Sequence, residues 1–485
     1  MTVALRYGAV AGATLVLVAA TASADSANGV RTYTTGGTAP FATALADPGL
    51  FPSSQKATAF ALTRAAGATY VRLAVTWRTI APSTRPDGFV ATDPTSPGYS
   101  WGGLDSAVEA ADSAGLRPIL DISSVPKWAF ARVPDPPNAG SPRASALGDF
   151  ATALATHFDG GTDGVPVEHI FQVWNEPNLT LDLSPVSAST YRKMVNAVAD
   201  AVHAVDPANL VVAGALEPVG HKKVKGQKWY SVRPLAFMRS LLCVSKGAHP
   251  HSTCSKQIRF DVWSHHPYTH GGPFGRAQIP DDVMLGDMPK MRALLNAGVR
   301  FHHVRSAQRV QFWVTEFGWD TNPPRRHAAS LALAARWTAE SFHQMWLSGV
   351  SLATWFLLQD YRSPSPYQSG LYFRSGSLDS ARPKGVLTAF RFPFVAYLHK
   401  STVSTWGRVA TSDQRLVTIQ FRPGKSGTWR TVALIRSNGY GIFKAKLRLK
   451  ATTKGWLRAV APGSGTSLAF SFKVPHAPNI GPWGY

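Results

Sequence analysis

Two glutamates each follow a run of apolar residues. Glu176 ends the stretch FQVWNE at 171–176 and is followed by Pro177. Glu316 ends the stretch FWVTE at 312–316 and stands two residues before Gly318. Charged side chains are seldom fully buried without partners, so acids that end two buried segments favour a functional role. The alternative is that each glutamate forms a salt bridge at the rim of the fold.

The chemistry open to such a pair follows from the two protonation states of a carboxyl group. A protonated carboxyl can give its proton to a leaving oxygen, and an ionised carboxylate can attack an electrophilic carbon. Transfer of a glycosyl group with retention of configuration uses two carboxyl groups about 5 to 5.5 Å apart. Their mutual repulsion raises the pKa of the acid partner. This chemistry requires neither a metal nor an organic cofactor, and we expect none.

The elements that would position these glutamates are short β-type runs that alternate with helical patterns between about residues 38 and 360. Apolar residues such as Leu147 and Phe150 recur at helical spacing and need a sheet to cover them. Eight such units predict an α/β fold, a (β/α)8 TIM barrel, with catalytic groups on the loops after the strands. Strands four and seven, which carry Glu176 and Glu316, face each other across an eight-stranded barrel. The expected strands are 41–46, 70–75, 117–122, 169–174, 210–213, 259–264, 310–315 and 351–357.

After about residue 400 the pattern changes to short runs in which apolar and polar residues alternate. Such alternation predicts strands with one buried face. We therefore expect a catalytic domain at 30–400, a small antiparallel, immunoglobulin-like β-sandwich at 401–476 and a tail at 477–485. In the run 442–450 the residues expected to face inward are Phe443, Ala445, Leu447 and Leu449. The residues expected to form a solvated outer row are Lys444, Lys446, Arg448 and Lys450.

The two glutamate segments together resemble glycoside hydrolase clan A. The resemblance rests on WNEPN at 174–178 and TEFG at 315–318, and it extends over about residues 38–360. The sequence is most similar to the cellulase-like family five and the xylosidase-like family thirty-nine. Clan A implies a (β/α)8 barrel and a retaining β-glycosidase that hydrolyses O-glycosidic bonds of an oligo- or polysaccharide through a covalent glycosyl-enzyme. Residue by residue, it implies that Glu176 is the general acid/base and Glu316 is the nucleophile.

The same resemblance implies roles for four polar residues near the two glutamates. Asn175 would bond the 2-hydroxyl of the sugar, and Arg72 on the second strand would orient the nucleophile. On the sixth strand, the segment WSHHPY at 263–268 is similar to a His/Tyr segment of the clan. It implies that His266 and Tyr268 line the subsite of the reacting sugar.

Two tryptophans are candidates for stacking on a sugar. Trp355 on the eighth strand matches the position of the sugar-stacking aromatic residue of the clan, and Trp128 follows the third strand. Sugars lay their apolar C–H faces on aromatic rings, which favours aromatic residues at strand ends. The alternative for each tryptophan is packing in the core.

Other acids near predicted strand ends compete for the catalytic roles. Asp121, Asp320 and Asp360 are three of them, and Asp360 fits a hydrogen-bonding role at the rim. Glu217 is the strongest rival, because it follows a strand and adjoins a basic loop, residues 217–257, that could neutralise it. A different class of function also stays open. It is a noncatalytic protein that binds an envelope polysaccharide in the barrel cleft and on the basic sandwich.

The N-terminus has the order of regions of a secretory signal. Arg6 precedes an apolar stretch at 9–20, and Ala22-Ser23-Ala24 stands before Asp25. We therefore expect a signal peptide at 1–24, cleaved after Ala24. The alternative, a retained membrane anchor, needs about 20 apolar residues, which is more than this stretch contains.

The chain has two cysteines, Cys243 and Cys254. An exported protein meets oxidising conditions, so we expect a disulfide between them that closes a local surface loop. The nearby His249 and His251 raise the alternative of a zinc site. A loop so rich in lysine and histidine is more often solvated, and we expect no metal.

The net charge is large, with 50 Lys and Arg against 28 Asp and Glu, or +22. Such a field would hold the protein near acidic polysaccharides or cell-envelope phosphates. Nucleic acid is the other partner that this charge favours, but we find no nucleic-acid-binding module, and export argues against that role. We expect a secreted, extracellular monomer in electrostatic association with the envelope, acting on an oligo- or polysaccharide that could itself be anionic.

Overall fold

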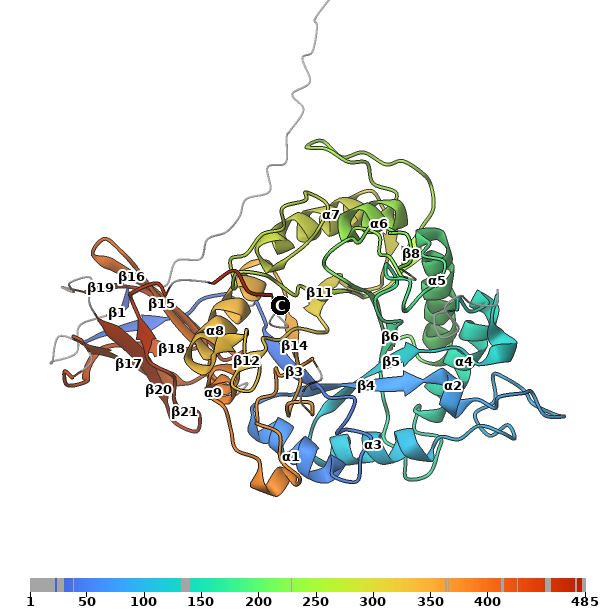
Figure 1. Cartoon of the computed structure of the whole chain (residues 1–485), viewed down its shortest axis with the longest axis horizontal. Helices are drawn as coiled ribbons and strands as arrows, with labels where there is room; N and C mark the ends of the chain where they lie inside the picture. The colour runs from blue at the N-terminus through green and yellow to red at the C-terminus, as the bar shows by residue number, and fades with distance from the viewer. Residues whose placement is uncertain are drawn as a thin grey trace, which may run out of the picture.

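The described part of the chain forms a barrel with a smaller β unit beside it. A computed structural model describes residues 22–23, 30–37, 39–131, 140–227, 229–362, 364, 366–410, 414–424, 426–449, 455–475 and 478–481. Eight parallel strands close into a barrel, helices surround it, and antiparallel strands stand next to α8 (Figure 1). The expected (β/α)8 barrel with a C-terminal β domain is confirmed.

The barrel strands follow one another around the barrel in chain order. Each pairs in parallel with the next, and β14 closes the barrel by pairing with β3, with Leu352 opposite Ala42. All eight lie where the sequence predicts strands. They are β3 (Ala42–Ala46), β4 (Tyr70–Thr76), β5 (Arg117–Ser123), β6 (Ile170–Val173), β7 (Leu210–Leu216), β9 (Val262–His265), β11 (Gln311–Val314) and β14 (Leu352–Phe356).

Apolar side chains fill the barrel toward the start of its strands. Seven strands contribute one residue each to a buried cluster, so the interior is a packed core and not a pore. Polar residues at the opposite, C-terminal ends of the strands therefore lie above a rigid, packed core. The cluster consists of Ala44, Ile119, Ile170, Val212, Val262, Trp313 and Leu352.

The helices cover the outside of the barrel with their apolar faces. In α5, Tyr191, Val195, Val198 and Val202 recur three or four residues apart and are fully buried, and the side chain of Ser187 caps the first turn. The main helices are α1 (Lys56–Ala65), α3 (Gly102–Ser113), α4 (Ala144–His157), α5 (Ala188–Val205), α6 (Pro234–Leu242), α7 (Met288–Arg300), α8 (Leu331–Leu347) and α9 (Gly385–Arg391).

The sixth predicted strand, 259–264, is divided in the structure. β8 (Ile258–Arg259) pairs outside the barrel with β10 (Val304–Arg305), and β9 begins only at Val262. Asp261 stands between the two strands. Its carboxylate accepts hydrogen bonds from the backbone N–H of Val211 and from Ser306. The barrel strand therefore starts later and ends at His265, one residue before His266.

The C-terminal β unit begins earlier than residue 401. One sheet has the order β15-β16-β19, with β15 at Phe394–His399, β16 at Thr402–Arg408 and β19 at Ile442–Arg448. The other contains β17 (Leu416–Arg422), β18 (Arg430–Arg436), β20 (Trp456–Ala461), β21 (Gly465–Thr466) and β22 (Phe470–Ser471). It also includes β1 (Ala22–Ser23) and β2 (Arg31–Thr34) from the N-terminal part, with β2 parallel to β18.

Both boundaries at 30 and 400 thus differ from the structure. The short strands β2 and β15 have no signal of their own that assigns them to the β unit, because their partners lie elsewhere in the chain. Within β19 the predicted alternation is confirmed: Phe443, Ala445 and Leu447 are buried, whereas Lys446 and Arg448 are exposed. Lys450 lies outside the described residues.

The β unit packs firmly against the barrel. Trp406 on β16 is buried against Phe41 and Trp346, with ring centroids 6.2 and 5.8 Å away. The Arg408 guanidinium is buried too and donates a hydrogen bond to Thr43 Oγ1 on β3. The two units therefore share part of one hydrophobic core.

Two remaining predictions concern the cysteines and the N-terminus. Cys243 and Cys254 form the expected disulfide, with Cα atoms 5.2 Å apart. Apart from Ala22–Ser23, the predicted signal peptide at 1–24 lies outside the described residues. Within the ranges given above, no helix has the length and apolar character needed to cross a membrane.

Candidate active site

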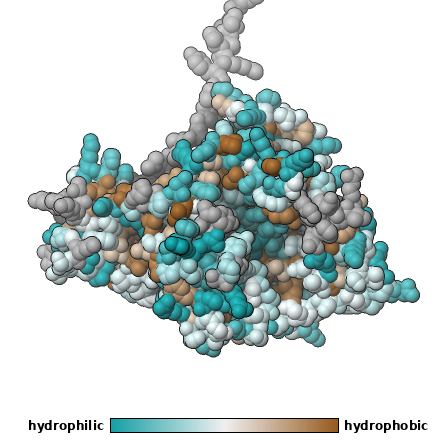
Figure 2. Space-filling model, viewed as in Figure 1, coloured by the Kyte–Doolittle hydropathy of each residue, from teal (hydrophilic) through white to brown (hydrophobic). Residues whose placement is uncertain are grey.

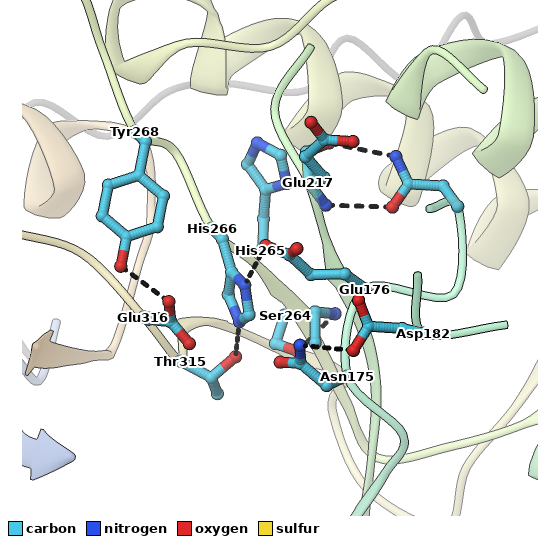
Figure 3. A network of polar contacts seen from close by, with 12 residues as sticks. Asn175, Glu176, Asp182, Glu217, Ser264, His265, His266, Tyr268, Thr315 and Glu316 are labelled. Atoms are coloured by element: carbon cyan, nitrogen blue, oxygen red, sulfur yellow. Dashed lines mark hydrogen bonds and ion pairs between the residues drawn. The ribbon is translucent and has the colours of Figure 1, made fainter. Parts of the chain in front are cut away.

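The polar residues predicted on four different strands meet at the C-terminal end of the barrel, and Figure 3 shows those that follow β6, β9 and β11. Arg72 lies on β4, and Asn175 and Glu176 follow β6. His266 and Tyr268 follow β9, and Glu316 follows β11. On the face seen in Figure 2, the surface is hollowed over the barrel and hydrophilic residues line the hollow.

Glu316 is held by a hydrogen bond at each carboxylate oxygen. Arg72 Nη1 donates to Oε2 at 3.1 Å, and Tyr268 Oη donates to Oε1 at 2.7 Å. Arg72 Nη2 also bonds Asp121 Oδ2 at 2.7 Å and Asn175 Oδ1 at 2.8 Å. The guanidinium is thus fixed between two carboxylates, and it holds Glu316 in one orientation.

Glu176 is positioned through a strained backbone. Its φ is 36°, and Trp174 has a φ of 73°, so two residues with side chains, one on either side of Asn175, adopt the left-handed region. Such conformations cost about 1–3 kcal/mol each and persist only where the surroundings enforce them. Here the backbone N–H of Glu176 donates to the carbonyl of Ala215 at 3.1 Å. The end of β7 therefore sets the direction in which the Glu176 side chain points.

A bulge in β7 makes this contact possible. The register between β7 and β9 shifts between Ala213 and Leu216, and Gly214 and Ala215 have φ values of 102° and 50°. A Cβ atom on Gly214 would lie 2.3 Å from the carbonyl oxygen of Ser264, so only glycine fits there. The Ser264 hydroxyl in turn accepts from the backbone N–H of Ala215 at 2.8 Å.

His266 connects the two glutamate segments. Its Nδ1 lies 3.0 Å from Glu176 Oε1, and its Nε2 lies 3.2 Å from Thr315 Oγ1, the residue before Glu316. Burial lowers the pKa of His266 to about 3, so the imidazole is neutral at neutral pH. The contact with Glu176 is therefore a hydrogen bond of a neutral imidazole and not an ion pair.

The electrostatic surroundings favour the protonated form of Glu176. Burial raises the pKa of this carboxyl well above its ordinary value, and the charges of Glu316 and Glu217 raise it further, against the opposing effect of Arg72. Glu176 consequently keeps a proton to higher pH than an ordinary glutamate. The arrangement supplies one carboxyl that can donate a proton and one carboxylate, Glu316, whose oxygens are both hydrogen-bond acceptors.

Asp182 belongs to the site, although sequence reasoning did not select it. Asn175 Nδ2 donates to Asp182 Oδ1 at 3.1 Å, while its Oδ1 accepts from Arg72. Because arginine only donates, these two partners fix which way the Asn175 amide faces. Burial, followed by the charge of Glu176, raises the pKa of Asp182 well above its ordinary value. The one available signal was an acid between two leucines, LDL at 181–183.

Trp355 lies on the eighth barrel strand as predicted, but its side chain packs in the core. Its side chain is fully buried on the outer side of the barrel, where it contacts Phe342 of α8, and its Nε1 donates to the carbonyl of Ser369 at 2.8 Å. The alternative of core packing is correct for this residue. The next residue, Phe356, packs with Tyr361 and Tyr367 in a small separate cluster that includes Ala46.

Trp128 is half-buried in the 3-10 turn Lys127–Ala129 that follows β5. Its ring contacts Trp77 and Phe89, with centroids 5.9 and 5.7 Å away, and its Nε1 donates to the carbonyl of Pro82. None of these contacts involves the glutamates. A role in stacking on a sugar stays a prediction.

The rival acids have other partners. Asp121 accepts from Arg72 and Gln172, which makes it a support for the guanidinium. Asp360 accepts from buried Lys384 at 2.6 Å and from the backbone N–H of Gly370, in agreement with a hydrogen-bonding role. Asp320 accepts from the backbone N–H of Gln368 at 2.7 Å.

Glu217 is an acid whose charge raises the pKa of Glu176. Its Oε1 is 3.1 Å from His221 Nε2, and its backbone is bonded to both ends of the Asn178 amide. It follows β7, whereas the two glutamates follow β6 and β11. Its charge acts on Glu176 without a direct hydrogen bond between the described atoms. No three His, Cys, Asp or Glu side chains in the described part of the chain are grouped so that they could hold a metal ion.

Comparison with solved structures finds several glycoside hydrolases at low sequence identity. A family 39 glycoside hydrolase from Bacteroides cellulosilyticus is 14% identical, with 84% of this chain and 81% of that chain covered and a TM-score of 0.49. A family 39 β-xylosidase from Caulobacter crescentus is 17% identical, with 79% and 81% covered and a TM-score of 0.48. A family 30 endoxylanase from Clostridium papyrosolvens is 12% identical, with 86% and 96% covered and a TM-score of 0.45.

Comparison with sequence families is decisive. No curated protein sequence matches the chain. The profile described as cellulase, glycosyl hydrolase family 5, matches residues 28–335 and thus more than half of the chain, including both glutamate segments. The resemblance to clan A is confirmed by this match. The chain therefore belongs to the cellulase family, glycosyl hydrolase family 5, and it is a glycoside hydrolase.

Proposed function

We propose that this glycoside hydrolase is a secreted retaining β-glycosidase that cleaves O-glycosidic bonds of an oligo- or polysaccharide. Glu316 is its nucleophile and Glu176 its general acid/base. The observation that carries the proposal is the unequal surroundings of the two carboxyl groups. Glu316 accepts hydrogen bonds from Arg72 and Tyr268, whereas burial and neighbouring negative charge favour a proton on Glu176.

The first step forms a covalent glycosyl-enzyme. A Glu316 oxygen attacks the anomeric carbon, the bond from that carbon to the glycosidic oxygen breaks, and the proton of Glu176 passes to the departing oxygen. The Arg72 and Asp121 pair holds the attacking carboxylate in place. The second oxygen of Glu316, bonded to Tyr268, stays oriented while the first reacts.

The second step releases the sugar. Glu176, now ionised, takes a proton from a water molecule, whose oxygen attacks the anomeric carbon while the bond to Glu316 breaks. Two displacements restore the original configuration and both carboxyl groups. Asn175, held between Arg72 and Asp182, has one amide hydrogen left over for the sugar 2-hydroxyl.

Both steps are favoured by a neutral partner beside Glu176. The imidazole of His266 remains neutral because burial lowers its pKa to about 3, so it adds no positive charge to the acid/base. A charged imidazole there would lower the pKa of Glu176, so that less of it would carry the proton needed in the first step and its carboxylate would be a weaker base in the second. His266 therefore orients Glu176 without opposing its protonation.

Trapping of the intermediate tests the proposed function. A 2-deoxy-2-fluoro glycoside with an activated leaving group slows both steps but stalls the second more, so the intermediate accumulates. Peptide mapping by mass spectrometry should place the sugar on Glu316, and NMR of fresh product from a normal substrate should show retained configuration. A label on Glu217 or Asp320, or an inverted product, would refute the assignment.

Export and partners complete the proposal. The signal-like segment 1–24, the disulfide and the net charge of +22 support a secreted, extracellular protein that associates electrostatically with the cell envelope and acts as a monomer. N-terminal sequencing of protein from the culture medium should begin at Asp25. Recovery of an intact N-terminus in the membrane fraction would instead indicate a retained anchor.

A further inference from the structure

The positive charge of the protein is concentrated at its C-terminal end. Residues 401–485 contain 13 Lys and Arg and a single acid, Asp413, so this part carries 13 − 1 = +12 of the total +22. The barrel, by contrast, contains nearly all of the acidic side chains. A charge imbalance of this kind in one small β unit indicates a positively charged surface on that unit. It does not fit a positive charge spread evenly over the chain.

The outer face of one sheet in this unit carries an ordered set of cations and aromatic rings. In β17 and β20 the buried residues alternate with half-buried ones, so Arg422 and Arg458 point away from the sandwich core. Both guanidinium groups lie over the ring of Trp429, 4.7 and 4.3 Å from its centroid. Arg422 also lies 6.0 Å from the ring of Trp456. We call Gln420, Arg422, Trp429, Trp456 and Arg458 the cationic face.

These arginines are oriented before any partner arrives. Arg458 Nε donates to Gln420 Oε1 at 2.8 Å, and this bond does not use the donors of the two terminal nitrogens. Stacking on Trp429 further restricts both guanidinium groups. Among the described residues, no ion pair involves a cation of β17, β18 or β20. The charges of the face are therefore not neutralised by neighbouring carboxylates of the described chain.

We propose that the cationic face is a noncatalytic binding site for a carboxylated polysaccharide. A guanidinium presents parallel N–H groups that match a carboxylate bidentately, and two of them side by side fit the repeated carboxylates of a polyuronate. Trp456 offers an aromatic surface at the end of the row for an apolar sugar face. The site lies on the β unit, outside the barrel that holds the reacting glutamates.

Nucleic acid fits this face less well. Proteins that bind single strands stack bases on free aromatic rings, but the ring of Trp429 is already covered by two guanidinium groups. The face extends over little more than the two neighbouring strands β17 and β20. Its residues form no element that could enter a groove of duplex DNA. A polyuronate can bind without an uncovered aromatic ring on the protein and without an element that enters a groove.

The test compares three double variants of the full-length protein by calorimetric titration with polygalacturonate, which is carboxylated, and with its methyl ester, which is neutral. We expect R422Q/R458Q to weaken binding of polygalacturonate about tenfold or more. R422K/R458K keeps the charge but loses the planar fork, and we expect a similar loss. The matched control K446Q/R448Q removes two exposed cations of β19, on the other sheet, and should change affinity less than about threefold. The methyl ester should not bind.

Several results would overturn the proposal. One is R422K/R458K binding as tightly as the wild type, and another is the control losing as much as R422Q/R458Q, since either indicates unspecific attraction by net charge. Tighter binding of DNA than of polygalacturonate, with the same dependence on Arg422 and Arg458, would identify nucleic acid as the occupant. The titration requires no turnover, so its failure is separate from failure of the glycosidase assays. All variants should retain the wild-type unfolding midpoint.

Discussion

At the residue scale, the proposed roles of the two glutamates, nucleophile and general acid/base, depend on the residues that surround each of them. Glu316 meets two donors, Arg72 and Tyr268, while Glu176 meets a neutral imidazole and two acids that raise its pKa. Both residues are glutamates at strand ends, so their type alone does not distinguish them. The difference in surroundings makes the roles testable by separate substitutions.

Replacement of Glu176 by alanine should affect substrates according to their leaving groups. A phenolate with a low pKa leaves without a proton, so the first step on activated aryl glycosides should persist, whereas natural glycosides should lose about 10²–10⁴-fold in rate. Azide, which needs no general base, should restore turnover and give a β-glycosyl azide. Glu316→Ala should form no glycosyl-enzyme on any substrate, and azide should give at most an α-glycosyl azide by a single displacement. A β-glycosyl azide from Glu316→Ala, or an α-glycosyl azide from Glu176→Ala, would contradict the assignment.

Replacement of Glu217 by glutamine should shift the pH dependence of the enzyme. The charge of Glu217 raises the pKa of Glu176, so its removal lowers that pKa. The protonated, active form of Glu176 is then lost at lower pH, and the alkaline limb of kcat/KM moves to lower pH, by about one unit or less. His221→Gln is the matched control, because it removes the partner of Glu217 but keeps the charge. A limb that moves upward in Glu217→Gln would exclude this electrostatic role.

At the element scale, the bulge of β7 determines where Glu176, the proposed acid/base, lies. The carbonyl of Ala215 accepts from the backbone N–H of Glu176, and Gly214 allows β7 to approach Ser264 of β9. Ala215 bonds the backbone of Glu176 and not its carboxyl group. The position of the Glu176 side chain therefore depends on the backbone path of the neighbouring strand.

Replacement of Gly214 by alanine should damage both stability and catalysis. The new Cβ would meet the Ser264 carbonyl at 2.3 Å at a φ of 102°, and we expect the free energy of unfolding to fall by about 2 kcal/mol or more. The shift of β7 should also lower kcat by moving Glu176. In Gly103→Ala, a control in the exposed face of α3, the new Cβ meets no atom within 4 Å, and stability should rise by about 0.5–1 kcal/mol. Denaturant unfolding and steady-state kinetics measure both effects, and wild-type values for Gly214→Ala would show that the bulge is dispensable.

At the scale of the whole molecule, the β unit is part of the barrel's structure. Trp406 and Arg408 are buried against the barrel, and β15, which lies before residue 400, pairs with β16 after it. The N-terminal strand β2 joins the same unit through β18. Dividing the chain near residue 400 would therefore separate strands of one sheet.

A chain ending at residue 400 should therefore be insoluble or unfolded. It leaves β15 unpaired and exposes Phe41 and Trp346, and removal of a buried tryptophan alone costs about 3–5 kcal/mol out of a total stability of about 5–15 kcal/mol. A control chain ending at residue 475 keeps the paired strands of the β unit and should stay soluble. Soluble expression and circular dichroism measure the outcome. A soluble, active chain of 400 residues would show that the barrel stands alone.

The sequence by itself determined the features that depend on local pattern. Eight β-type runs separated by helical stripes predicted the barrel, and the segments WNEPN and TEFG predicted both glutamates and, through the resemblance, Arg72, Asn175, His266 and Tyr268 as their neighbours. The disulfide between Cys243 and Cys254 was predictable because they are the only two cysteines and stand close together in the chain. Each of these signals is contained in a short segment, so no knowledge of packing was needed.

The tertiary structure decided what local pattern does not encode. In β14 every residue is buried, so no alternation shows which side chains face the barrel interior, and Trp355 proved to face α8. Asp182 and the pairing of β2 with β18 depend on segments that meet only after folding. Contacts between distant segments arise from packing and loop closure, which leave no periodic trace in either segment.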